Sequence, residues 1–235
     1  MKDRDGIKFH HLTIPFKSNR HERTCIAPLK PRDVTVIDSP YGIHWESFFD
    51  TDFPELVKQQ PHAAFEVDNM AFYLKDEEIL VPPYTDISGS ISAFISVLGM
   101  PVKLMQSGAK QVENPIDNGR KGLRYHHIGM PSNGHWEGEV YVPHLQLAYL
   151  PGNLNTYGVE WLRFGEGNQS PEIIKNQPHI AFEVDNIEEV IVGEKVIYHS
   201  GRDTPGIVVA MIEVDGISVE FLELDRSIVG DKYNG

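Results

Sequence analysis

The sequence predicts an α+β fold made of two homologous domains, each a curved antiparallel sheet with few short helices. Three observations predict it: an internal repeat that covers most of the chain, short strand-like runs separated by turn residues, and no long amphipathic helical pattern. A chain of 235 residues is long enough for two small domains that each bury a core.

The internal repeat defines the domain organisation. The matching blocks are residues 9–12 with 125–128, 41–45 with 157–161, and 60–69 with 177–186. The offset is 116 residues in the first block and 117 in the third, so a single one-residue insertion or deletion accounts for it. We expect an N-terminal domain over residues 1–107 and a C-terminal domain over residues 123–230, with the boundary in the polar stretch 107–122.

Each copy is predicted to end in a hairpin. In the C-terminal copy, apolar runs within residues 208–224 flank Asp215-Gly216, a dipeptide that suits a tight turn with positive φ. The counterpart in the first copy spans residues 93–105 around Gly99.

A strand and a capped short helix precede each hairpin. The predicted strand over residues 179–184 leads into Asp185-Asn186, a polar pair that can cap a helix over residues 187–192. The first copy has the same order, with a helix over residues 70–74. The intermediate strands are residues 196–199 and 79–81.

Four potential metal ligands lie in apolar strand contexts of the C-terminal copy: His127, Glu160, His179 and Glu220. Strand alternation puts Glu220 on the face opposite Val219 and Phe221. Any one such residue is more often structural than a ligand, but the set together indicates a metal site. Imidazoles and carboxylates suit one borderline divalent ion such as Ni, Co, Zn, Mn or Fe.

These motifs resemble the vicinal-oxygen-chelate (VOC) superfamily of glyoxalases, bleomycin-resistance proteins and extradiol dioxygenases. The resemblance covers nearly all of residues 123–225 and is carried by His127-Ile128-Gly129, residues 179–186 and Val219-Glu220-Phe221-Leu222. It implies two tandem domains, each made of two βαβββ modules that form a curved, half-open mixed β-barrel. It also implies that His127, Glu160, His179 and Glu220 hold the metal.

The resemblance further implies a glyoxalase- or epimerase-like isomerase or lyase, which acts on a small oxygen-chelating substrate through a metal-stabilised enolate. Glu220 first, and Glu160 second, would carry the proton. One departure is the lack of helical periodicity in residues 131–139, where the family usually has a helix. The polar and aromatic residues expected to be loop residues rather than ligands are His135, Trp136, Glu139 and His144.

The first copy matches this ligand pattern only in part. The aligned pairs are His11 with His127, His44 with Glu160, His62 with His179, and Lys103 with Glu220. Because an ammonium group repels a cation, we expect the N-terminal copy to have lost its metal. A three-histidine site made of His11, His44 and His62 is the alternative.

Two other functions stay open. An extradiol Fe(II) dioxygenase could use His127, His179 and Glu220, although Glu160 would close a position and residues 208–224 contain no His, Tyr or Pro. A non-catalytic small-molecule binding or resistance protein would need no complete ligand set. The sequence contains no glycine-rich phosphate-binding loop and no Gly-x-Ser-x-Gly motif. The residues around Cys25 do not resemble those around a catalytic cysteine.

Composition limits the partners and the compartment. The net charge is −13, from 21 basic and 34 acidic residues with no basic stripe, so nucleic acid and anionic membranes are not expected partners. The lone Cys25 excludes an intrachain disulfide, and no signal peptide or membrane-spanning run is present, so we expect a cytoplasmic protein. A small-molecule substrate and a monomer or homodimer are the expected partner and assembly.

Overall fold

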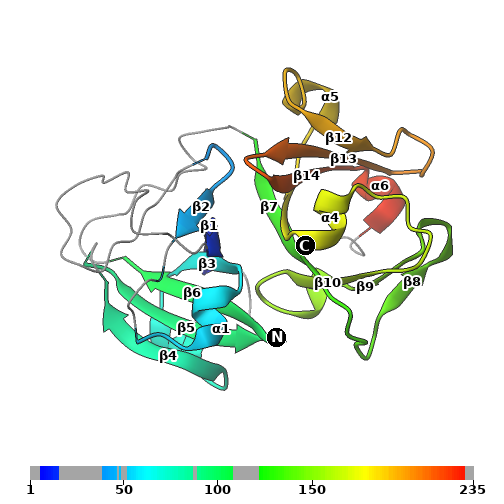
Figure 1. The fold of residues 1–235 in the computed structure, drawn as a ribbon. Coiled ribbons are helices and arrows are strands. Elements are labelled where there is room, and N and C mark those ends of the chain that lie inside the picture. Colours follow the sequence, from blue (N-terminus) through cyan, green and yellow to red (C-terminus); the bar gives the residue numbers. More distant parts are fainter. Residues whose placement is uncertain are drawn as a thin grey trace, which may run out of the picture. The chain divides into compact units, whose positions relative to one another are not determined.

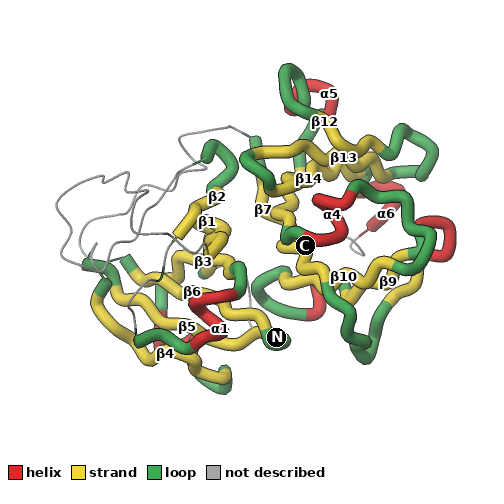
Figure 2. The backbone as a smooth tube through the Cα atoms, in the orientation of Figure 1, coloured by secondary structure: helices red, strands yellow, loops and turns green. Residues whose placement is uncertain are grey.

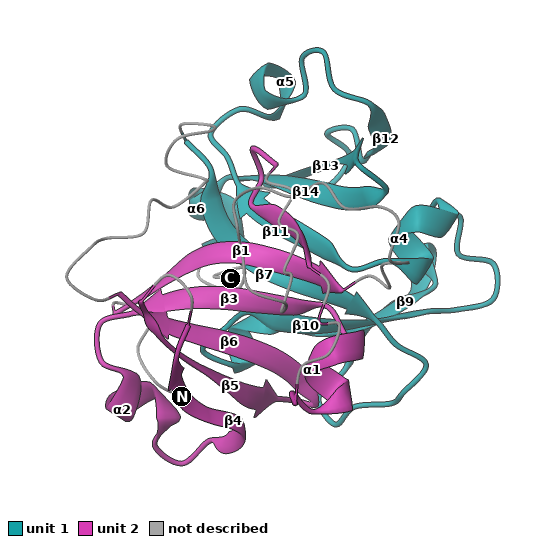
Figure 3. Cartoon of the chain, turned by 60° about the vertical axis from the view of Figure 1, so that its left-hand side comes forward, with its two compact units in different colours: residues 1, 122–235 teal, residues 2–121 magenta. Residues whose placement is uncertain are grey.

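The computed structural model describes residues 6–15, 39–46, 48, 52–86, 89–107 and 122–230. The chain divides into two compact units, Lys2–Lys121 and Gly122–Gly235 together with Met1, which Figure 3 shows in separate colours. We call them the N-terminal unit and the C-terminal unit. Most of the predicted boundary stretch, residues 108–121, lies outside the described residues, as does Cys25.

The N-terminal unit contains a six-stranded sheet in the spatial order β2-β1-β3-β6-β5-β4 (Figure 1). Its strands are β1 (Ile7–Pro15), β2 (Ile43–Glu46), β3 (His62–Val67), β4 (Glu78–Thr85), β5 (Ile91–Val97) and β6 (Met100–Gln106). Its described helices are α1 (Glu55–Gln59) and α2 (Met70–Leu74).

The C-terminal unit contains an eight-stranded sheet in the spatial order β12-β13-β14-β11-β7-β10-β9-β8. Its strands are β7 (Arg124–Pro131), β8 (Val140–Val142), β9 (Leu147–Leu150), β10 (Val159–Phe164), β11 (His179–Glu183), β12 (Val196–His199), β13 (Ile207–Val214) and β14 (Ile217–Leu224). The helical elements are η1 (Pro143–Leu145), η2 (Gly152–Leu154), α4 (Glu172–Asn176), α5 (Ile187–Val190) and α6 (Arg226–Val229).

The protein is mostly β, and each sheet curls into a half-barrel (Figures 2 and 3). No helix in the described part of the chain is longer than five residues. The prediction of curved, strand-rich sheets with few short helices is therefore confirmed. The sheets are mixed rather than antiparallel, because β1 pairs parallel with β2, β3 with β6, β7 with β10 and β11 with β14. None of the described helices is long and apolar enough to cross a membrane.

Both predicted hairpins are present. Strands β13 and β14 pair antiparallel, and the turn residues Asp215 and Gly216 have φ of 51° and 82°. Strands β5 and β6 are joined in the same way by Leu98 and Gly99, with φ of 52° and 82°. Two consecutive positive φ values match the right-handed twist of the flanking strands, which is why glycine stands at the second position of each turn.

The core of the C-terminal unit lies on one face of the central strands β7, β11 and β14. The side chains of Ile128, Ile180, Phe182, Val219 and Phe221 are fully buried there. Strand alternation puts His127, Gly129, His179 and Glu220 on the opposite face of the same strands. One face therefore stabilises the fold, and the other is available for polar chemistry.

The segment between β7 and β8 forms no helix, as its sequence predicts. Trp136 from this segment stacks on Trp161 of β10, with ring centroids 5.2 Å apart and planes at 14°. Arg163 Nη2 donates to Glu139 Oε2 at 2.6 Å and ties the segment to the same strand. Because Trp161 pairs in register with Met130, the indole pair covers the core face of the sheet.

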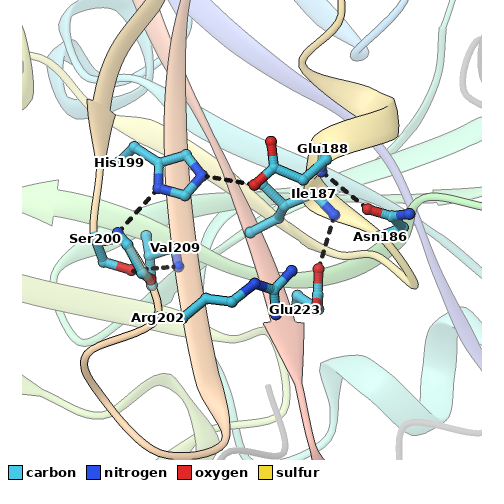
Figure 4. Close-up of polar contacts among 9 residues, drawn as sticks. Asn186, Ile187, Glu188, His199, Ser200, Arg202, Val209 and Glu223 are labelled. Atoms are coloured by element: carbon cyan, nitrogen blue, oxygen red, sulfur yellow. Dashed lines mark hydrogen bonds and ion pairs between the residues drawn. The ribbon is translucent and has the colours of Figure 1, made fainter.

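Helix α5 is held to the sheet by a polar network, which Figure 4 shows. Asn186 caps the helix by accepting from the Glu188 backbone N–H at 3.0 Å. Glu223 of β14 accepts from the Ile187 backbone N–H at 3.0 Å and from Arg202 at 2.9 Å. The N-terminal unit repeats the contact with an amide, because Gln106 accepts from the Met70 backbone N–H at 2.8 Å.

We predict that Glu223→Gln lowers the stability of the C-terminal unit at neutral pH by about 0.5–1 kcal/mol. The amide oxygen can still accept from the Ile187 backbone N–H, but the negative charge that pairs with Arg202 is lost. The backbone hydrogen bond from Ile187 and the bonds from Arg202 lower the pKa of Glu223 below its ordinary value. A carboxylate with a lowered folded pKa contributes stability that is present above its unfolded pKa and lost as the pH falls through the folded pKa.

The difference between the wild type and Glu223→Gln should therefore shrink as the pH falls below about 4. Thermal melts of both proteins between neutral pH and pH 3 would measure it. A stability difference that stays constant over this pH range would contradict the claim that the negative charge of Glu223 stabilises the fold.

Candidate metal centre

Three donor atoms converge on one face of the C-terminal sheet. Nε2 of His127 lies 3.2 Å from Nε2 of His179 and 3.2 Å from Oε2 of Glu220. Nε2 of His179 lies 3.0 Å from the same Glu220 oxygen. Each of the three side chains is no more than 13% exposed. The three atoms thus form a nearly equilateral triangle in a sheltered position.

The register of three neighbouring strands builds this triangle. Strand β11 lies between β7 and β14, and its residue Ala181 pairs with His127 on one side and with Glu220 on the other. Two residues earlier, His179 pairs with Gly129 of β7. Ala181 and Gly129, which pair with the three donor side chains, are both small residues. Their small size leaves room on this face of the sheet for the donor atoms.

The His179 ring lies so close to Gly129 that no residue with a side chain fits at this position. A Cβ atom added at Gly129 would lie 2.1 Å from Cε1 and 2.3 Å from Nε2 of His179. Such separations are far shorter than any van der Waals contact, so any side chain here would displace the ring. The backbone conformation of Gly129 does not itself require glycine, so the constraint is the approach of His179 alone.

The triangle has the dimensions of a metal site. Metal–ligand bonds of about 2.1 Å at right angles place the donor atoms about 3.0 Å apart, as on one face of an octahedron. Burial raises the pKa of Glu220, but the hydrogen bonds from His127 and His179 outweigh it and hold this pKa well below the ordinary value. Among the described atoms, buried Nδ1 of His179 has no hydrogen-bond partner. His127, His179 and Glu220 could therefore hold a metal ion.

Glu160 lies beside the triangle rather than in it. Oε1 of Glu160 is 3.8 Å from Nε2 of His127, and the carboxylate does not join the group of converging donors. Its other oxygen, Oε2, accepts from the Gly152 backbone N–H at 3.4 Å. Burial raises the pKa of Glu160, and the nearby Glu220 carboxylate raises it further, while His127 lowers it. The sequence predicted Glu160 as a fourth ligand, and the structure places it next to the three.

The N-terminal unit has the same strand pairing but a different set of side chains. Thr13 occupies the place of Gly129, because it pairs with both His62 and His44. Lys103 occupies the place of Glu220, because it pairs with Ala64 as Glu220 pairs with Ala181. A β-branched residue and an ammonium group thus stand where the C-terminal unit has a glycine and a carboxylate.

The histidines of the N-terminal unit are consequently arranged in another way. His11 stacks on His44, with centroids 4.0 Å apart, whereas His62 turns to Phe94 and Phe48 at 5.2 Å and 5.6 Å. Burial first, and then the Lys103 charge, lower the pKa of His62 to about 3. His11, His44 and His62 do not form a converging donor group within the described residues. This arrangement gives no support to the three-histidine alternative.

The remaining residues singled out in the sequence take no part in the triangle. His135 and His144 are exposed, Trp136 packs on Trp161, and Glu139 pairs with Arg163. Sequence reasoning missed Gly129 as a site residue. The signal was available in the repeat, because Thr13 stands at the aligned position of the copy predicted to lack metal.

Comparisons with known proteins do not identify a family. No family model matches the chain, and no curated protein matches it. A solved structure of a hypothetical protein of Bacillus halodurans C-125, BH1468, is 17% identical, with a TM-score of 0.21, and the match covers 70% of this chain and 92% of that one. A second solved structure, that of SMU.1112c, is 13% identical with a TM-score of 0.19, and the match covers 69% of this chain and 96% of that one.

We predict that Gly129→Ala weakens divalent-metal binding by about 10-fold or more, because the new Cβ displaces the His179 ring. Isothermal titration with Co(II) or Zn(II) would measure the affinity, and circular dichroism would check the fold. Gly134→Ala is the matched control, since a Cβ there meets Ser132 Oγ at 3.2 Å in an exposed loop. Equal affinities for Gly129→Ala and the wild type would contradict the role of Gly129.

Proposed function

We propose that this protein is a metal-dependent enzyme of the VOC superfamily, an isomerase or lyase that acts on a small substrate with adjacent oxygen atoms. The observation that carries the proposal is the triangle of His127 Nε2, His179 Nε2 and Glu220 Oε2, with sides of 3.0–3.2 Å. Two imidazoles and one carboxylate form a donor set that suits Ni, Co, Zn, Mn or Fe.

A divalent ion held there would act as a Lewis acid, polarise a chelated substrate oxygen and make the neighbouring C–H more acidic. The proton then needs a base close to the same place. Glu160 fits this role better than Glu220, because both imidazoles contact one Glu220 oxygen, while Glu160 stands outside the triangle. This reverses the order expected from the sequence.

An Fe(II)-dependent ring-cleaving dioxygenase is the second candidate. Two histidines and one carboxylate on one face of the ion leave the remaining positions open, a pattern typical of non-haem iron oxygenases. With His127, His179 and Glu220 as the only protein ligands, and Glu160 left outside the group, no fourth side chain of the described residues would close one of these positions. Against this function, β13 and β14 carry no histidine or tyrosine that could assist oxygen chemistry.

We predict about one divalent ion per chain in protein prepared without a His tag or chelator, measured by elemental mass spectrometry. Glu220→Gln should lose this ion, because the amide neutralises the one charged ligand. Lys103→Gln, at the aligned position of the N-terminal unit, should retain it. A Glu220→Gln protein that is folded and holds a full complement of metal would remove the basis of the proposal.

We predict that metal-loaded protein exchanges a C–H proton with solvent in small hydroxy-carbonyl or 2-oxo compounds, followed by NMR in D2O. Glu160→Gln should keep its metal and lose exchange by about 10²–10⁴-fold, the usual contribution of a positioned base. Oxygen consumption with catechols by the Fe(II)-loaded wild type, without such exchange, would favour the dioxygenase instead.

A further inference from the structure

A β-bulge in β7 places two consecutive histidines on one side of the sheet. The pairing with β11 runs from Ala181 and His127 directly to Phe182 and Tyr125, so the register shifts by one residue at His126. In a regular strand, consecutive side chains point to opposite faces. The extra residue of a bulge relaxes this rule and re-aims a side chain, often next to a functional site.

The two imidazoles of this bulge contact each other. Nδ1 of His126 lies 2.8 Å from Nδ1 of His127, and the rings meet edge to face with centroids 5.1 Å apart. His126 is 8% exposed, so water does not surround the pair. His127 thus has its two ring nitrogens in different environments: Nε2 faces Glu220 and His179, and Nδ1 faces His126.

We propose that His126 is a positioning residue for the metal ligand His127, an inference that rests on the metal site proposed above. A neutral imidazole that offers its Nε2 lone pair to an ion carries its proton on Nδ1, and a hydrogen bond from Nδ1 to an acceptor holds this tautomer in place. Nδ1 of His126 accepts that bond, which fixes the tautomer and the ring orientation of His127. His126 is not among the three converging donors.

An acceptor of this kind has a known energetic effect. Partners that hold the second nitrogen of a ligating histidine contribute about 10–100-fold to metal affinity, and carboxylates, backbone carbonyls or water usually supply them. Here the neighbouring residue in the chain supplies the acceptor, because the bulge brings it to the same face. The consequence is that His126 should influence the metal without being a ligand.

The N-terminal unit provides a matched control. Its strand β1 has the same bulge, since the pairing with β3 skips His10 between Phe9 and His11. Nδ1 of His10 lies 2.7 Å from Nδ1 of His11. Lys103 replaces the carboxylate in that unit, so the same histidine pair exists where we expect no ion. Replacing His10 therefore measures the structural cost of removing such a pair by itself.

The test compares His126→Phe, His126→Asn and His10→Phe with the wild type. Each protein is titrated with Co(II), and the affinity, the visible absorption spectrum and the thermal stability of the metal-free protein are recorded. We expect His126→Phe to lower Co(II) affinity by about 10–100-fold and to change the spectrum. His126→Asn should restore much of both, because its Oδ1 accepts a hydrogen bond where Nδ1 does.

His10→Phe should leave the Co(II) affinity and the spectrum unchanged, whatever it does to thermal stability. Wild-type affinity and spectrum in His126→Phe would overturn the inference, as would an Asn variant no better than the Phe variant. A wild-type protein that binds no Co(II) would overturn the proposed metal site itself, and the inference with it. The two failures are therefore distinguishable by the wild-type titration alone.

Discussion

The pairing register of β7, β11 and β14 is the constraint on which the candidate metal centre depends. It sets Gly129 against His179 and sets Ala181 between His127 and Glu220, so two small residues leave space for three donor atoms. A slip of one residue would turn every donor to the opposite face, into the core of Ile128, Phe182 and Phe221. The apolar face therefore fixes the register, and the register fixes the chemistry of the other face.

The two units share one architecture but differ at a few positions around the candidate metal centre. Both units keep the strand pairing, the bulge with two histidines, the turn with two positive φ values and the capped helix. Three residues differ in kind around the candidate site: Thr13 stands in the place of Gly129, His44 in the place of Glu160, and Lys103 in the place of Glu220. A bulkier side chain and a positive charge thus lie at the same place in the N-terminal sheet, where a cation would be disfavoured.

Local sequence patterns predicted most of the fold, because turns, caps and strand alternation depend on neighbouring residues. The Asp215-Gly216 turn and the Asn186 cap follow from such patterns and from the repeat. The grouping of His127, His179 and Glu220 was implied by the family resemblance of their motifs. The approach of His179 to Gly129 could not be predicted in the same way, since it depends on cross-strand register. Strand alternation also assigns His126 to the wrong face, because the pattern contains no sign of the bulge.

The most direct test of the metal centre is a crystal structure of protein loaded with Zn(II) or Co(II), with anomalous diffraction data collected at the metal edge. The account predicts one anomalous peak per chain, within about 2.0–2.2 Å of His127 Nε2, His179 Nε2 and a Glu220 oxygen, and no peak between His11 and Lys103. A strong peak in the N-terminal unit, or none at the three C-terminal donors of a fully loaded protein, would contradict it.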